Sequence, residues 1–76
     1  MNFDKVKETM VNTLGCDEEK IALEASLAED LNIDSLDAVE LVMALEEEFG
    51  VKIPDEELAN MKTVGNIVAC IEKYQA

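Results

Sequence analysis

The stretch from Asp34 to Gly50 constrains the fold of this chain more than any other segment. Its apolar residues recur every three to four positions, which predicts a helix from about Ser35 to Phe49. Asp34 stands where an N-cap residue would, Asp37 follows three positions later, and Gly50 can end the helix. No segment shows the sustained apolar and polar alternation of a strand. The pattern therefore favours an all-α fold.

Three further helical segments are expected around this one. Residues 3–14 carry apolar side chains at helical spacing, with Asn2 able to cap the start and Gly15 the end. Residues 55–60 predict a short helix with acidic residues in its first turn. Thr63 is the expected N-cap of a last helix, which begins directly after it.

The connection between the first two helices, residues 16–33, is long for so small a domain. Short helical turns and four apolar residues are expected to pin it to the core: Ile21, Leu27, Leu31 and Ile33. Residues 1–76 fit a single domain with one modest core. We therefore expect a small all-helical bundle with a long first loop.

The net charge of the chain limits the kinds of partner that it can bind. Acidic residues outnumber basic ones by 18 to 6, which gives a net charge of −12. Such a surface repels nucleic acid and anionic membranes, resists self-association and favours partners with basic patches, so we expect a monomer. We expect no membrane-spanning segment and no signal peptide. Cys16 and Cys70 lie outside any CxxC pair, which favours free thiols in a reducing compartment, the cytoplasm or an organelle matrix.

The expected central helix carries two apolar stripes when residues advance by about 100° each. The first should face the core and consists of Ala38, Leu41, Val42, Leu45 and Phe49. The second consists of Leu36, Val39 and Met43, with Glu40, Glu46 and Glu47 beside it. An exposed apolar row fringed by acids would suit docking of a basic partner. The alternative is a fully wrapped helix whose second stripe is more core.

Ser35 is expected at the first helical position, beside backbone N–H groups that lack intrahelical partners. A phosphate esterified there would meet the positive end of the helix dipole. The simpler interpretation makes this serine part of a capping device, although Asp34 as the cap leaves the hydroxyl free. Catalysis by Ser35 is not expected, because the chain lacks histidine and a Gly-x-Ser-x-Gly elbow. The chemistry is then done to this serine by another protein.

Calcium binding is the main alternative from another class. Asp30, Asn32 and Asp34 match the alternating oxygen ligands that open an EF-hand loop. The match ends there, because Ser35 stands where the turn needs Gly and Leu41 where a bidentate Glu should close the loop. No dedicated metal site is expected. An interaction module with one weak surface cation site and no covalent cargo stays open.

Three blocks of sequence carry a resemblance to a known family: Asp34-Ser35-Leu36-Asp37, the run from Val39 to Phe49, and Ile53-Pro54-Asp55-Glu56. With the acidic first connection, the chain resembles the discrete acyl carrier proteins of fatty acid synthesis nearly end to end. The resemblance implies a four-helix bundle with a short third helix. It also implies a carrier rather than an enzyme.

The resemblance further implies that Ser35 receives 4′-phosphopantetheine from coenzyme A through a separate phosphopantetheinyl transferase. Asp34 would help to position the metal and the serine during that transfer. The thiol of the arm would then carry acyl groups as thioesters between the enzymes of fatty acid synthesis. Carriers of polyketide, peptide or aminoacyl intermediates share the scaffold and are the nearest alternative.

Docking and cargo positions follow from the same resemblance. Leu36, Glu40, Met43 and Glu47 match positions that dock partner enzymes in this family, in agreement with the second stripe. Acyl chains enter the bundle in such proteins, so Val42, Leu45 and Ile53 are expected to line that space. Asn32 and Ile33 depart from the family pattern, where many relatives have Gly and a small residue.

Overall fold

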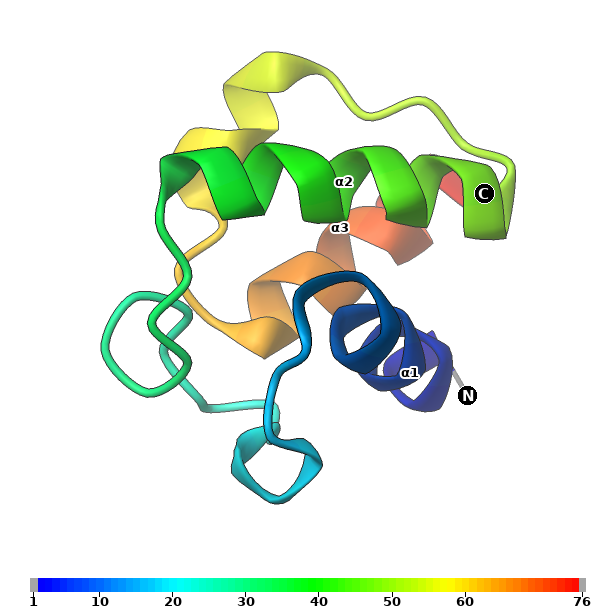
Figure 1. The fold of residues 1–76 in the computed structure, drawn as a ribbon. Helices are drawn as coiled ribbons and strands as arrows, with labels where there is room; N and C mark the ends of the chain where they lie inside the picture. Colours follow the sequence, from blue (N-terminus) through cyan, green and yellow to red (C-terminus); the bar gives the residue numbers. More distant parts are fainter. Residues whose placement is uncertain (1, 76) are drawn as a thin grey trace.

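The computed structural model describes residues 2–75, and these form a bundle of helices (Figure 1). The elements are α1 (Asn2–Leu14), η1 (Glu18–Lys20), α2 (Ser35–Phe49), η2 (Asp55–Asn60) and α3 (Val64–Gln75). The two η elements are 3₁₀ helices, and η1 is a single turn inside the long connection. The predicted all-α fold with a long first loop and a short third helix, η2, is confirmed.

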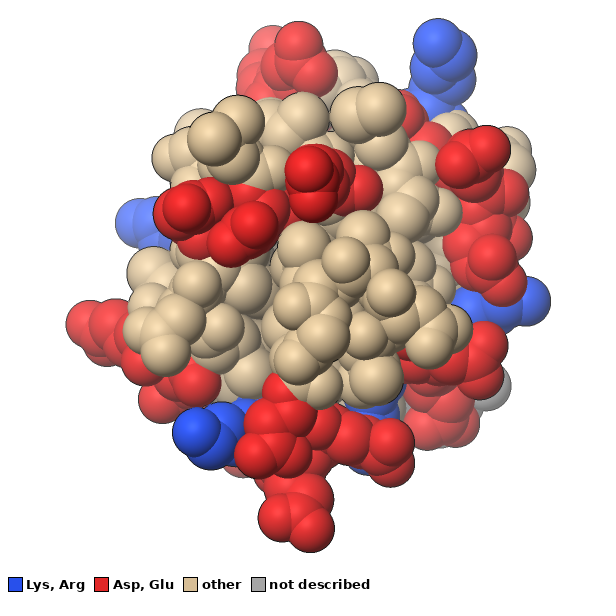
Figure 2. All heavy atoms as spheres, in the orientation of Figure 1, with Lys and Arg blue, Asp and Glu red and all other residues tan. Residues whose placement is uncertain are grey.

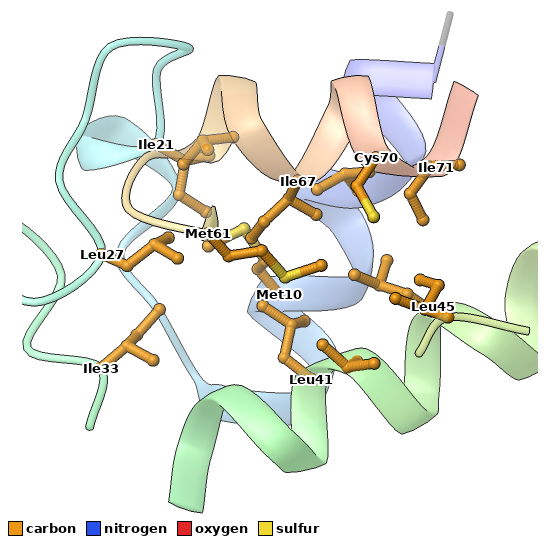
Figure 3. Packing of buried hydrophobic residues seen from close by; sticks show 14 of the residues in the cluster. Met10, Ile21, Leu27, Ile33, Leu41, Leu45, Met61, Ile67, Cys70 and Ile71 are labelled. Atoms are coloured by element: carbon orange, nitrogen blue, oxygen red, sulfur yellow. The ribbon is translucent and has the colours of Figure 1, made fainter. Parts of the chain in front are cut away.

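The three α-helices enclose one apolar core. Figure 3 shows Met10 of α1, Leu41 and Leu45 of α2, and Ile67 and Ile71 of α3 converging on its centre. All five side chains are almost completely buried. Because these positions recur at helical spacing on each element, the first apolar stripe of α2 faces a core that it shares with α1 and α3.

The long connection is part of this core. Ile21, Leu27 and Ile33 are buried in it, and Leu31 packs half-buried against it, as predicted. The Ile33 N–H donates to the Leu27 carbonyl at 2.8 Å, which closes a compact turn just before α2. These contacts therefore fix the position of the residues that lead into α2.

The same connection also pairs with the start of α3. The Leu27 N–H donates to the Lys62 carbonyl at 3.0 Å, and the Gly65 N–H donates to the Leu23 carbonyl at 2.8 Å. A Cβ at Gly65 would lie only 3.0 Å from the Leu23 carbonyl oxygen. Glycine therefore fits this crossing because it lets the two backbones approach closely.

The first residues of α1 and α3 differ in how well they were predicted. Thr63 Oγ1 accepts the Asn66 N–H at 3.2 Å, and Asn66 Oδ1 accepts the Thr63 N–H at 3.0 Å, so Thr63 is the expected cap. The prediction for Asn2 was wrong. Asn2 is already the first helical residue of α1, and its side-chain amide donates to Gln75 Oε1 at 2.9 Å.

Two acidic side chains hold η2 and the segment before it. Glu57 Oε2 accepts hydrogen bonds from the Tyr74 hydroxyl at 2.7 Å and from Lys73 Nζ at 3.1 Å. The Tyr74 hydrogen bond, followed by that of Lys73, lowers the pKa of the Glu57 carboxyl. Glu46 Oε2 accepts the Ile53 N–H at 2.7 Å. These bonds fasten η2 to α3 and the 50–53 turn to α2.

Candidate functional site

The start of α2 is built by a reciprocal cap. Asp34 has extended backbone geometry, and its Oδ1 accepts the Asp37 N–H at 2.9 Å. In return, Asp37 Oδ2 accepts the Asp34 N–H at 3.4 Å. This is the arrangement expected from the sequence. At the other end, Gly50 takes the left-handed conformation with φ of 66° and ends the helix.

Ser35 is the first residue of α2, and its side chain is exposed. Because Asp34 supplies the cap, the Ser35 hydroxyl is not needed for that purpose. Helical geometry also gives the N–H groups of Ser35 and Leu36 no partner within the helix. The serine therefore offers an accessible hydroxyl next to free donors, which fits attachment of a phosphate ester.

A hollow of about 460 Å³ opens beside Ser35. Its walls come from the long connection, the first turns of α2, η2 and the residues just after η2. The apolar side chains that line it are Leu27, Ala28, Ile33, Ala38, Val39, Leu58 and Met61. A volume of this size is in the range of small-molecule sites. The hydroxyl of Ser35 thus lies at the rim of an apolar recess.

The predicted acyl-pocket residues Val42, Leu45 and Ile53 do not line this hollow. All three are buried in the closed core. Ala38 lies one helical turn before Val42 on the same face of α2, and its small side chain leaves space there. The hollow therefore opens one helical turn before Val42, and the role of these three residues in lining an acyl pocket stays a prediction.

The second stripe of α2 is exposed. The exposed fractions of its side chains are 77% for Leu36, 41% for Val39 and 59% for Met43. The alternative that this stripe is more core is therefore wrong. Figure 2 shows acidic groups spread over the visible face of the protein, with neutral surface between them and few lysines. An apolar row in such a surface can bury area against a basic partner.

The three glutamates beside the stripe have different surroundings. Glu40 and Glu47 are exposed, as a docking role requires. Glu46 is half-buried, and its Oε2 is engaged by the Ile53 N–H. Its carboxylate therefore holds the turn after α2, a role that sequence periodicity could not reveal because the turn folds back over seven positions.

Acidic side chains of the loop before α2 accept hydrogen bonds from nearby backbone N–H groups. Asp30 Oδ2 accepts the Ser26 N–H at 2.7 Å, and Asp34 Oδ1 caps α2. Asn32 has a positive φ of 54°. Within residues 2–75, no three His, Cys, Asp or Glu side chains come together as candidate metal ligands. Two residues of the EF-hand match, Asp30 and Asp34, thus serve local turn and cap hydrogen bonds.

Neither cysteine thiol lines the hollow beside Ser35. Cys70 is buried in the core, and Cys16 is half-buried after α1. Burial raises the pKa of both thiols, and the charge of Asp37 raises that of Cys16 further. A raised pKa keeps a thiol protonated and weakly nucleophilic. None of the helices among residues 2–75 has the length and apolar character needed to cross a membrane.

Comparisons with known proteins identify relatives over nearly the whole chain. A family model described as "Phosphopantetheine attachment site" matches residues 4–71, which include the start of α2. A curated protein of Thermosynechococcus vestitus (strain NIES-2133 / IAM M-273 / BP-1), named "Acyl carrier protein", is 60% identical over 74 residues. That similarity covers 97% of this chain and 91% of the relative.

Proposed function

This chain belongs to the acyl carrier protein family, and from that premise we propose that Ser35 carries its 4′-phosphopantetheine arm. A member of this family is a carrier of acyl groups rather than an enzyme. When bound, the arm supplies a terminal thiol that holds an acyl group as a thioester. The protein contributes the attachment point, the docking surface and a recess for the cargo.

The observation that supports Ser35 is its exposed hydroxyl on the first turn of a capped helix. The chain has one other serine, Ser26, and the two differ in geometry. Ser26 Oγ accepts the Glu29 N–H at 3.2 Å in a turn of the long connection, so its oxygen already serves a local bond. Ser35 has the free donors of a helix start beside it, which stabilise a phosphate ester.

Asp34 is the proposed assistant in the transfer. Its Oδ1 is occupied by the cap, yet the residue is exposed and directly precedes the serine. A carboxylate there can help to position a metal ion of the transferase and the serine hydroxyl. The cap also fixes the backbone on both sides of the reacting oxygen, which lowers the entropy lost when the transferase binds.

We propose that the transferase and the enzymes of fatty acid synthesis dock on α2. Leu36, Val39 and Met43 supply apolar contact area, while Glu40 and Glu47 attract basic patches. Weak docking suits a carrier that must leave one enzyme before it meets the next. Glu46 contributes by holding the turn beside this surface rather than as a free charge.

The hollow beside Ser35 is the proposed entrance for the acyl chain. Ile33, Ala38, Leu58 and Met61 give it an apolar lining, which favours transfer of methylene groups from water. We also propose that the acyl chain reaches three buried residues of the core: Val42, Leu45 and Ile53.

The proposal also covers the domain organisation, oligomeric state and cellular location of the protein. One core joins α1, α2, η2 and α3, which supports a single acyl carrier domain over residues 1–76. The net charge of −12 supports a monomer at ordinary salt. The free thiols of Cys16 and Cys70 support residence in the reducing cytoplasm.

The test is the intact mass of the protein after incubation with coenzyme A and a phosphopantetheinyl transferase. Wild-type protein should gain the mass of one arm, and Ser35→Ala should gain nothing. Ser26→Ala is the matched control, because it removes the other serine hydroxyl at the same hollow and should load as wild type does. No gain in wild type, or a gain that survives Ser35→Ala, would refute the proposal.

A further inference from the structure

Lys62 borders the same hollow as Ser35. The other charged side chains that line this hollow are Glu29 and Asp34, both acidic. Lys62 is therefore the single cation among the described residues that form its walls. In a chain with six lysines against 18 acidic residues, a cation at this position is a specific feature.

The backbone of Lys62 is fixed at the rim of the hollow. Its N–H donates to Asn66 Oδ1 at 3.0 Å, and its carbonyl accepts the Leu27 N–H at 3.0 Å. Bonds on both sides hold the residue between the long connection and the cap of α3. The side chain is exposed, so its ammonium group can turn toward the hollow without disturbing the core.

Lys62 also differs from the lysines that are already ion-paired. Among the described residues, the ion pairs are Lys5 with Glu48, Lys7 with Glu18 and Lys73 with Glu57. Lys62 takes part in none of them. Its charge is thus available to an anion that arrives at the hollow.

A phosphodiester on Ser35 would add a negative charge to an acidic neighbourhood. Asp34 and Asp37 flank the serine in sequence, and Glu29 lies on the same hollow. The donors at the start of α2 offset part of this repulsion. A lysine that lines the same hollow can offset more of it. Ammonium and phosphate groups also form strong charge-assisted hydrogen bonds.

We propose that Lys62 is a positioning residue that binds the phosphodiester on Ser35 and holds the arm across the hollow. This inference rests on the proposed attachment at Ser35. With the phosphate drawn toward Lys62, the arm leaves the serine over the apolar recess and toward η2. The acyl group is then presented to the recess between encounters with enzymes, and it leaves when a basic partner competes for the phosphate.

The experiment is phosphorus-31 NMR of the arm-loaded protein across a series of NaCl concentrations. The variants are Lys62→Gln, which removes the charge, and Lys62→Arg, which keeps it. Lys52→Gln is the matched control, because Lys52 is an exposed lysine beyond the end of α2. The 15 residues of that helix span about 22 Å, so Lys52 lies well away from the serine.

In wild type, the phosphorus resonance should move with added salt as the ion pair is screened. Lys62→Gln should shift the resonance at low salt and abolish most of that dependence, whereas Lys62→Arg and Lys52→Gln should behave as wild type. A Lys62→Gln spectrum that matches wild type, or an equal change in Lys52→Gln, overturns the inference. Intact mass is measured first, because failure to load Ser35 contradicts the proposed function, whereas an unchanged resonance on loaded protein contradicts only the role of Lys62.

Discussion

The substitution Leu36→Ala should weaken docking while leaving the fold intact. Leu36 is 77% exposed in the free protein, so most of its side chain is still available for burial by a partner. Full burial of a leucine side chain contributes about 1.5–3 kcal/mol, and the exposed part left after truncation to alanine gives a loss of about 1–2 kcal/mol. That loss corresponds to a dissociation constant raised about 5- to 30-fold.

The assay is titration calorimetry of the unloaded protein with a phosphopantetheinyl transferase, paired with thermal unfolding. The melting temperature of Leu36→Ala should stay close to that of wild type, because truncating an exposed side chain changes stability by no more than about 0.5 kcal/mol. Ionic strength must be the same in every titration, since the acidic surface makes the affinity depend on salt.

Leu23→Ala is the matched control for this prediction. Leu23 is also an exposed leucine, at 48%, but it lies in the long connection and outside the stripe on α2. It should leave the dissociation constant unchanged. The reasoning fails if Leu36→Ala binds as tightly as wild type, or if Leu23→Ala weakens binding to the same extent.

Four further predictions concern stability. Asp34→Ala removes the acceptor of the Asp37 N–H and should cost about 0.5–2 kcal/mol in urea unfolding, whereas Asp34→Asn keeps a capping oxygen and should cost little. Asn32 has φ of 54°, so Asn32→Ala should cost about 1 kcal/mol and Asn32→Gly should not; equal stabilities of the two would count against strain at this position. The Tyr74 hydrogen bond lowers the pKa of the Glu57 carboxyl in the folded protein. The stabilisation from this bond is present above the ordinary carboxyl pKa of about 4.3 and is lost as the pH falls through the pKa of the folded state. Tyr74→Phe should therefore make the melting temperature fall less steeply as the pH is lowered. With a net charge of −12, the melting temperature should rise between low salt and about 0.5 M NaCl, and a constant value would contradict self-repulsion.

The limits of α2 could be predicted because they depend on neighbours in sequence. Asp34 and Asp37 are three positions apart and cap each other, and Gly50 follows the last apolar residue of the pattern. The exposed stripe was predictable for a similar reason, since helical spacing alone separates it from the core stripe. The proposal of Ser35 as the attachment site rests on these local features together with the family resemblance.

The features that the sequence did not reveal join distant segments. The sequence predicts a cap at Asn2, but in the structure its side chain bonds to Gln75, which is 73 positions away. The sequence predicts a surface charge at Glu46, but the turn after α2 places the Ile53 N–H where it donates a hydrogen bond to the Glu46 carboxylate. The hollow is set by which side chains leave space where three segments meet, and helical periodicity carries no information about such volumes.

The backbone hydrogen bonds between residues 23–27 and 62–65 join the segment that leads to Ser35 with one that follows η2 in the sequence. A fragment that stops after η2 would keep the serine, its capping carboxylates and every residue of the acidic helix. It would lack the support that fixes the preceding loop, and one rim of the recess would vanish. The proposed modification of Ser35 should thus depend on contacts across the fold, and a short peptide spanning the motif should gain the arm more slowly than the folded protein when intact mass is followed over time.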